Sequence, residues 1–304
     1  MSVGPAVTGE VASVTGFEEA PPRISEWKRF RRVFFGRGMV VVGCLILLCV
    51  FLTAIFAPWL APYDPYKPGV GDPLEQPGAR HLLGTDLLGR DQLSRLIYGA
   101  RTALLVGFIS VLAGAVIGIS LGIAAGFSRG AANPLIMRLM DALMCFPNIL
   151  LALVIAAILG GSIVNVIIAL TVSLIPTYAR VACGLTLSVR ENDYVLAARL
   201  MGFGNLYIML RHILPNVFPP IMVLVTMQLG AAILAEAGLS FLGIGIEPPG
   251  AAWGAMVSDA YQYMMRNPVL SIAPGLAIML TGFAFNMVGD GLRDAVDPRL
   301  RGLL

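Results

Sequence analysis

Few residues in this sequence are of the types that carry out chemistry, and those present are scattered. Its 304 residues include two histidines, His81 and His212, and four cysteines that form no C-x-x-C pair. Metals such as zinc are bound by closely spaced clusters of these residues, so the pattern predicts no metal site and free, buried thiols. Neither Lys28 nor Lys67 stands in a G-x-x-x-x-G-K-[ST] phosphate-binding loop. We therefore expect no catalytic residue, metal or nucleotide site in this chain.

The elements that would position these residues are strongly apolar. Hydrophobic residues make up 57% of the sequence and charged residues 13%, and the mean hydropathy is +0.82. These values are far from those of a soluble domain, and no basic and aromatic cluster indicates nucleic acid. Several apolar runs are long enough to cross a bilayer core of about 30 Å. The sequence predicts an all-α membrane protein with six transmembrane helices, at 39–60, 103–126, 141–160, 163–187, 221–242 and 271–288.

Charge predicts that both ends of the chain lie inside the cell. A basic, aromatic-flanked segment at 27–32 stands just before the first span, as in an inner-side anchor. With the N-terminus inside, most of the 21 Lys and Arg residues fall on the inner side, which predicts an N-in, C-in topology. The expected parts are a cytoplasmic tail at 1–38, the first span at 39–60, an extracytoplasmic segment at 61–98, a five-helix core at 99–292 containing a cytoplasmic loop at 190–220, and a cytoplasmic tail at 293–304.

The extracytoplasmic segment is expected to be irregular at first and helical later. The prolines and glycines of PYDPYKPGVGDP disfavour regular structure. Thr85 and Asp86 are placed to cap a short amphipathic helix at 87–98. His81, Asp86 and Asp91 are of the types that bind cations. However, Asp86 has a capping role and Asp91 has arginine neighbours, so no cation site is predicted.

Small residues and prolines are placed where helices pack and bend. Gly107, Gly114, Gly118 and Gly122 recur in the second span, and the last three are spaced every four residues. Such a stripe permits close helix packing in lipid. Pro147 predicts a bent entry into the third span, and Pro176 predicts a kink in the fourth.

One polar-containing stretch, residues 191–220, interrupts the apolar second half of the chain. Asn192 and Asp193 are placed to cap a short helix, and Gly202 stands where a helix end favours a left-handed residue. A second short helix is expected at 206–212, with Pro215 in the first turn of the next span. On the first helix, one face is predicted to hold Tyr194, Ala197, Ala198 and Met201, with Arg199 pointing elsewhere. The stretch therefore predicts a compact loop that another protein can bind.

This loop resembles the EAA loop of ABC-importer permeases, whose consensus is Glu-Ala-Ala, three residues, Gly, nine residues and Ile-x-Leu-Pro. Ala197, Ala198 and Gly202 match in register, while Leu196 replaces the Glu and His212 the Ile. Leu214–Pro215 match the end. The resemblance extends over nearly the whole chain, and is greatest to the second (C-type) permease subunit of dipeptide and oligopeptide importers. The other stretches that carry it are LAPYDPY, HLLGTDLLGRDQLSRLIYGAR, AEAGLSFLGIGIEPP and FNMVGDGLRDAVDPR.

The resemblance implies a type I ABC-importer permease fold in a bacterial inner membrane. The implied partners are a B-type permease subunit forming a heterodimer with this chain, two ABC ATPase subunits, and an extracytoplasmic solute-binding protein. ATP and Mg²⁺ would be bound by the ATPase subunits, so this chain would not be an enzyme. The resemblance also includes importers of nickel and glutathione. The sequence does not distinguish these from peptide importers, because the resemblance implies that substrate choice lies largely in the binding protein. The residues expected to couple the chain to an ATPase are Tyr194, Ala197, Ala198, Arg199, Gly202 and Pro215.

Glu236 is the ionisable residue that the sequence places in the outer part of the fifth span. If it faces the translocation path, its carboxylate could meet the ammonium group of a peptide; alternatively, it is a packing residue hydrogen-bonded to a neighbour. Asp141, Arg180 and Asp290 fall towards cytoplasmic ends, where Arg180 would reach the headgroups. An ion-coupled carrier would bury a relay of such groups near mid-membrane. A carrier working alone and a purely structural scaffold are therefore the less favoured function classes.

Overall fold

The computed structural model describes residues 26–128 and 130–296, which form a bundle of helices. Within these residues, five helices are long and apolar enough to cross a membrane, and a bent helix pair supplies a sixth span. The predicted six spans are obtained when this bent pair is counted as one broken span. The single-helix spans are α2 (Gly38–Ile55), α4 (Gln92–Phe127), α7 (Ile163–Val189), α10 (Leu214–Phe241) and α12 (Val269–Val296), and the bent pair is α5 (Ala132–Met144) with α6 (Asn148–Leu159).

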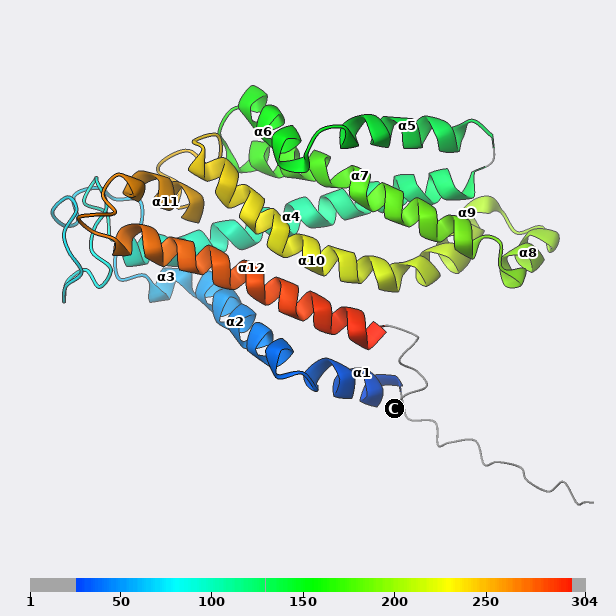
Figure 1. Cartoon of the computed structure of the whole chain (residues 1–304), viewed down its shortest axis with the longest axis horizontal. Coiled ribbons are helices and arrows are strands. Elements are labelled where there is room, and N and C mark those ends of the chain that lie inside the picture. Colours follow the sequence, from blue (N-terminus) through cyan, green and yellow to red (C-terminus); the bar gives the residue numbers. More distant parts are fainter. Residues whose placement is uncertain (1–25, 129, 297–304) are drawn as a thin grey trace, which may run out of the picture.

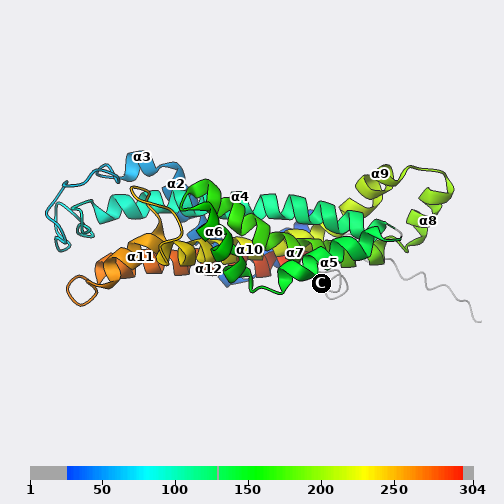
Figure 2. The ribbon, with the colours of Figure 1, turned by 90° about the horizontal axis from the view of Figure 1, so that it is seen from above.

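The bundle is elongated and thin, and its two ends carry different structures (Figures 1 and 2). One end holds α1 (Glu26–Phe35), the last turns of α12, α8 (Asp193–Leu200) and α9 (Asn205–Ile208). The other end holds α3 (Ala57–Leu60), α11 (Trp253–Tyr261) and the irregular segment that precedes α4. An even number of crossings brings the first and last described helices to the same end. The tails predicted at 1–25 and 297–304 lie outside the described residues.

The centre of the bundle is the contact between α4 and α7, the most extensive between any two helices. A Cβ atom on Gly118 would lie 2.6 Å from the Cβ of Tyr178, and one on Gly122 would lie 2.4 Å from the carbonyl oxygen of Ala179. Only glycine allows this approach, since real Cβ atoms do not come so close. The predicted glycine stripe therefore packs α4 against α7, whereas Gly107 faces Ile233 of α10.

The prediction of a short helix at 87–98 is wrong about both the start and the end of the helix. The helix begins at Gln92 and continues without a break to Phe127, so the predicted amphipathic helix and the second span are one element. Asp91 is its N-cap, and its side chain accepts a hydrogen bond from the backbone N–H of Ser94. Asp86 instead accepts from the backbone N–H groups of Leu88 and Arg90, which stabilises the preceding turn. Several Asp and Thr residues in this stretch can cap, and tertiary contacts choose among them.

The span predicted at 141–160 is broken near its start. Helix α5 begins earlier, at Ala132, and is bent from α6 by 84° across the segment that contains Phe146 and Pro147. Proline lacks an N–H and disfavours helical backbone in the residue before it, so the first helix ends here. Pro147 was predicted to bend the chain at this point. The bend itself is confirmed, but it separates two helices of similar length.

The second short helix predicted at 206–212 is not a separate element. Helix α9 passes through a π-helical turn, Met209–Ile213, directly into α10. Pro215 therefore lies inside a continuous helix and does not begin a new one. Its ring would crowd the carbonyl group of Arg211, four residues earlier, in a regular α-helix. The wider π turn, in which the N–H of Leu214 bonds to the carbonyl of Met209, relieves that crowding.

Candidate coupling surface and translocation path

The loop at 191–204 is held in shape by its glycine. Helix α8 ends at Leu200, and Gly202 adopts a φ of +80° in the left-handed region, as predicted. The N–H groups of Gly202 and Phe203 donate to the carbonyl groups of Arg199 (3.0 Å) and Ala198 (3.2 Å). These two bonds satisfy carbonyls that a helix end leaves without partners. Gly202 therefore sets the direction in which the chain leaves α8.

The predicted contact face of α8 is divided between the inside and the outside of the chain. Ala198 is only 1% exposed and packs, with Val195, against the chain itself. Ala197 and Tyr194 are exposed. Consecutive helical residues point about 100° apart, so neighbouring alanines need not share a surface. Ala198 thus supports the loop from within, and Ala197 remains free to meet another protein.

Large apolar side chains cover the outer surface of the loop. Leu200 is 90% exposed, an unusual state for a leucine unless another protein or lipid covers it. Phe203 and Tyr207 stack with ring centres 4.8 Å apart and join the two sides of the turn. We call this surface the loop tip; it comprises Leu196, Leu200, Met201, Phe203, Leu206, Tyr207 and Leu210. Leu196, which replaces the family glutamate, lies within it.

Two arginines attach the loop to the end of α4, a role that the sequence analysis did not predict. The guanidinium of Arg199 lies 4.6 Å from the ring centre of Phe127, the last residue of α4. Arg190 donates from Nη1 to the carbonyl oxygen of Gly126 at 2.7 Å. Cations are favoured at a helix C-terminus, where carbonyl groups lack helical partners. Arg199 therefore positions the loop from the inner side.

Glu236 lies inside this chain and away from any open surface. Its side chain is 1% exposed and accepts a hydrogen bond from the Oγ of Ser240 at 2.8 Å. The same Oγ accepts from the backbone N–H of Ile246 at 3.3 Å, which ties the segment after α10 back onto the helix. This geometry favours the packing alternative. A role for Glu236 in the translocation path stays a prediction.

Two further features lie on the surface of the spans. Arg180 of α7 forms an ion pair with Asp141 of α5, so the guanidinium predicted to reach the headgroups has a carboxylate partner within the chain. An apolar groove of about 660 Å³ runs between α10, α11 and α12. Several glycines line it, namely Gly230, Gly238, Gly254, Gly275 and Gly282.

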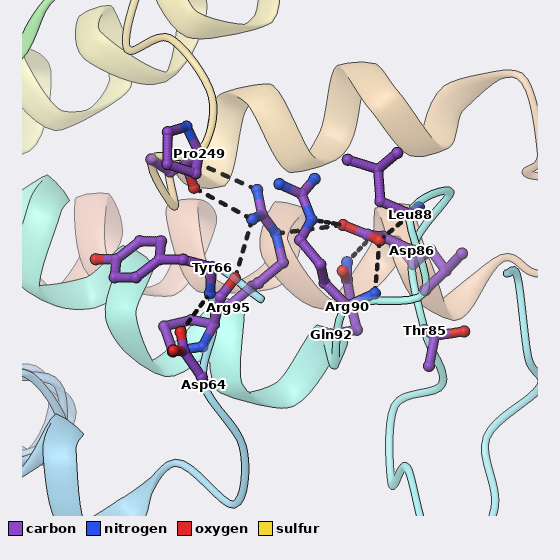
Figure 3. Close-up of polar contacts among 12 residues, drawn as sticks. Asp64, Tyr66, Thr85, Asp86, Leu88, Arg90, Gln92, Arg95 and Pro249 are labelled. Carbon is purple, nitrogen blue, oxygen red and sulfur yellow. Dashed lines mark hydrogen bonds and ion pairs between the residues drawn. The ribbon is translucent and has the colours of Figure 1, made fainter. Parts of the chain in front are cut away.

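At the opposite end, Arg95 connects segments that are far apart in the sequence (Figure 3). Its side chain is 2% exposed and donates to the carbonyl oxygens of Pro65 (3.2 Å), Pro249 (3.5 Å) and Gly250 (3.3 Å). The Asp86 carboxylate lies 3.5 Å from the Nε of Arg95 and 2.6 Å from that of Arg90. These contacts fasten the segment before α4 to α4 and to the loop before α11.

The residues of cation-binding type in this segment bind each other. His81 Nδ1 lies 2.9 Å from Asp91 Oδ1, while Asp86 is paired with the two arginines. Throughout 26–128 and 130–296, no group of three His, Cys, Asp or Glu residues is arranged to hold a metal ion. Partial burial raises the pKa of the nearby Asp259 carboxyl, against the opposing effect of the Arg95 and Arg90 guanidinium groups.

Comparison with known families identifies the chain. Residues 118–302 match the family described as binding-protein-dependent transport system inner membrane component, and residues 25–78 match the N-terminal transmembrane domain of oligopeptide transport permease C. The chain belongs to the binding-protein-dependent inner membrane component family. It is therefore a multi-span permease subunit of an inner membrane.

Relatives of this inner membrane component have similar lengths and named transport roles. This chain is 44% identical over 283 residues to the di/tripeptide transport system permease protein DppC of Pseudomonas aeruginosa, and the match covers 91% of this chain and 93% of the relative. It is 43% identical over 276 residues to the glutathione transport system permease protein GsiD of Pectobacterium atrosepticum, covering 90% and 92%. A putative peptide transport system permease protein of Brucella suis is 44% identical over 297 residues, covering 96% and 98%.

A solved structure supports the fold of this inner membrane component. The fold of this chain matches a chain of the MetNI methionine ABC transporter in an inward-facing conformation, with a TM-score of 0.55 and 21% sequence identity. The match covers 67% of this chain and 96% of that chain. The predicted fold of an ABC-importer permease is thereby confirmed.

Proposed function

We propose that this chain is the C-type permease subunit of an ATP-driven importer of di- or oligopeptides. The observation that carries the proposal is the 44% identity over 91% of the chain to a di/tripeptide permease protein. Glutathione, the solute named for other relatives, is itself a small peptide with charged ends, so the two solutes share one chemical class. In this proposal the chain forms half of a translocation path, with a B-type permease subunit as the other half.

Energy enters, in this proposal, through the loop tip. The chain binds no nucleotide, and two ABC ATPase subunits hydrolyse ATP with Mg²⁺. One of them covers the exposed apolar side chains of Leu200 and its neighbours, and the burial of that surface stabilises the contact. Arg199 and Arg190 hold the loop against α4, while α9 continues into α10. When the ATPase subunits close on ATP, the loop moves with them, and the spans change between inward- and outward-open states.

A pair of leucine substitutions tests this proposal. Leu200→Asp places a charge on the loop tip, and Leu82→Asp makes the same change at a side chain that is 62% exposed on the opposite end. The importer is purified with its partner subunits and reconstituted with its binding protein. We expect Leu200→Asp to reduce co-purification of the ATPase subunits and ATP-driven peptide uptake at least tenfold, because a carboxylate must lose its water. Leu82→Asp should leave ATPase association unchanged.

Two outcomes would contradict the proposal. The first is normal ATPase association and uptake in the Leu200→Asp importer. The second is solute uptake by this chain alone, driven by an ion gradient without any ATPase. A competition experiment separates the two solutes within the class. Uptake of labelled dialanine is measured in the presence of unlabelled glutathione, and uptake of labelled glutathione in the presence of unlabelled dialanine.

A further inference from the structure

The Asp141–Arg180 ion pair lies on an open surface of the membrane-spanning part. In the chain, 46% of the Asp141 side chain and 56% of the Arg180 side chain are exposed. The exposed residues Val181, Gly184 and Leu187 continue the same side of α7 towards its last turn. A charged pair that faced hydrocarbon would lose the solvation of its exposed half, which is why ionisable residues in spans face protein or a water-filled cavity. Lipid hydrocarbon is therefore the wrong environment for this ion pair.

A second observation on the same surface leads to the same conclusion. The break between α5 and α6 begins one turn after Asp141, and Cys145, Phe146 and Pro147 are all exposed there. The backbone is not helical at this break, and the two helices diverge by 84°. Backbone that leaves the helical ladder at membrane depth is tolerated only in protein or beside water. The break and the ion pair thus lie on one surface, formed by α5, the start of α6 and the second half of α7, where a charged pair and non-helical backbone stand among apolar side chains.

We propose that this surface lines the hydrated path of the solute. As a peptide passes, the ion pair opens, and Asp141 and Arg180 each bind one charged end of the peptide in place of the other residue. The inference rests on the proposed function and names the residues that would contact the peptide. The carboxylate of Asp141 fits an N-terminal ammonium, and the guanidinium of Arg180 fits a C-terminal carboxylate. Arg180 donates to Asp141 from Nη2, and its other N–H donors remain available to a second acceptor.

The strength of the pair suits a path better than a binding site. An ion pair that is half exposed contributes little net free energy, so exchanging one partner for the end of a peptide is close to neutral. Conduction requires contacts that are favourable enough to admit a solute and weak enough to release it. The exposed pair therefore offers a complement to both charged ends of a peptide.

Two native cysteines test whether the surface is hydrated. Cys145 at the break and Cys49 on α2 are both exposed in the chain, but only Cys145 lies beside the ion pair, its Sγ donating to the carbonyl oxygen of Asp141 at 3.3 Å. Variants keep one of these two cysteines and replace the other three by Ser. In membranes holding the whole importer, a charged methanethiosulfonate reagent should label Cys145 and not Cys49, because thiolate forms only in water. Labelling of Cys145 that is as negligible as that of Cys49 would overturn the proposal.

Four peptides test the contacts themselves: dialanine, its N-acetyl form, its C-terminal amide and the doubly capped form. Each uptake rate is divided by the wild-type rate for the same peptide, which cancels the selectivity of the binding protein. We expect Asp141→Asn to slow peptides with a free ammonium about fivefold and to spare the acetylated ones. Arg180→Gln should slow peptides with a free carboxylate and spare the amides.

The alternative is that the pair only holds α5 against α7. In that case both variants would slow all four peptides equally, and the exchanged pair Asp141→Arg with Arg180→Asp would restore uptake of all of them; either result overturns the proposal. The two levels of inference fail separately. If the wild-type importer moves no peptide, the proposed function is wrong, whereas Cys145 labelling still reports on the hydrated surface.

Discussion

The guanidinium of Arg199 lies 4.6 Å from the ring centre of Phe127 and so joins the helix of the coupling loop to the last residue of α4. Arg190 reinforces this connection through the carbonyl oxygen of Gly126. In the proposed mechanism, a force applied at the loop tip therefore acts on α4 as well as on α10, the helix that follows directly in sequence. The position of α4 matters because its glycine stripe packs against α7.

The first prediction concerns this contact between ring and cation. Arg199→Ala and Phe127→Ala should each loosen the loop. Because both changes remove the same contact, the effect of the double variant should fall short of the sum of the two single effects by the interaction energy, about 0.5–1 kcal/mol. The measurement is ATP consumed for each peptide imported, which should rise. Arg211→Ala, an exposed arginine of the following π turn, is the control and should change nothing. Equal effects at Arg199 and Arg211 would show that the loss of positive charge alone is responsible.

The second prediction compares two glycines in the same turn. Gly202 has a φ of +80°, whereas Gly204, the N-cap of α9, has a φ of −65°. A Cβ at either position would meet no atom within 4 Å, so crowding does not distinguish them, whereas the left-handed φ of Gly202 does. Gly202→Ala should destabilise the loop by about 1 kcal/mol and lower ATPase coupling, while Gly204→Ala should leave it intact. Hydrogen exchange of α8 amides measures the difference, and identical exchange in both variants would contradict it.

The third prediction concerns close packing of α4 against α7. Gly118→Ala would place a Cβ 2.6 Å from Tyr178 Cβ and 2.7 Å from the carbonyl oxygen of Ile175. The helices must separate, which should cost about 1–3 kcal/mol and lower the thermal unfolding temperature of the importer in detergent. Gly184→Ala on α7 meets nothing within 4 Å and serves as the matched control. A stable Gly118→Ala importer would mean that the helices pack less tightly than described.

The fourth prediction concerns pH at the outer end. Partial burial raises the pKa of Asp259 above its ordinary value of 3.8, so the folded state holds this proton more tightly than the unfolded chain. The associated stability is complete below the ordinary pKa and is lost as the pH rises through the folded pKa. Asp259→Asn should therefore unfold at a higher temperature than wild type at neutral pH, and the difference should vanish below pH 3.8. A difference that is constant with pH would assign the effect to packing.

The helical spans were predictable because their apolar length alone identifies them. Their ends and joints were not. The start of α4 at Gln92 depends on Asp91 being fixed by Ser94 and His81, contacts that a linear pattern of capping residues does not rank. The continuity of α9 with α10 depends on a π turn that accommodates Pro215, and the sequence pattern favours a helix start at a proline. The break in the third span was visible only as a proline.

The candidate site was predictable in its position and less so in its orientation. Gly202 was identified by its place after a short helix, and its conformation is as expected. The pairing of Ala197 with Ala198 as one contact face was wrong, because Val195 and Ala198 turn towards the core. Arg199 was expected to point away from the alanine face and to couple to an ATPase, and its contact with Phe127 was not predicted, since nothing in the sequence links the two residues. Such pairs between distant segments require the folded chain.

The π turn between α9 and α10 has a mechanical consequence. Because the helix does not stop there, Asn205–Phe241 is one run of 37 residues, about 55 Å long at 1.5 Å per residue. A rod of that length is a lever: a tilt of about 5° at the loop would carry its far end through about 5 Å. That far end holds Ser240, which bonds both Glu236 and the segment leading to α11. In the proposed mechanism, a small movement at the loop tip would thus become an opening movement at the opposite end of the bundle.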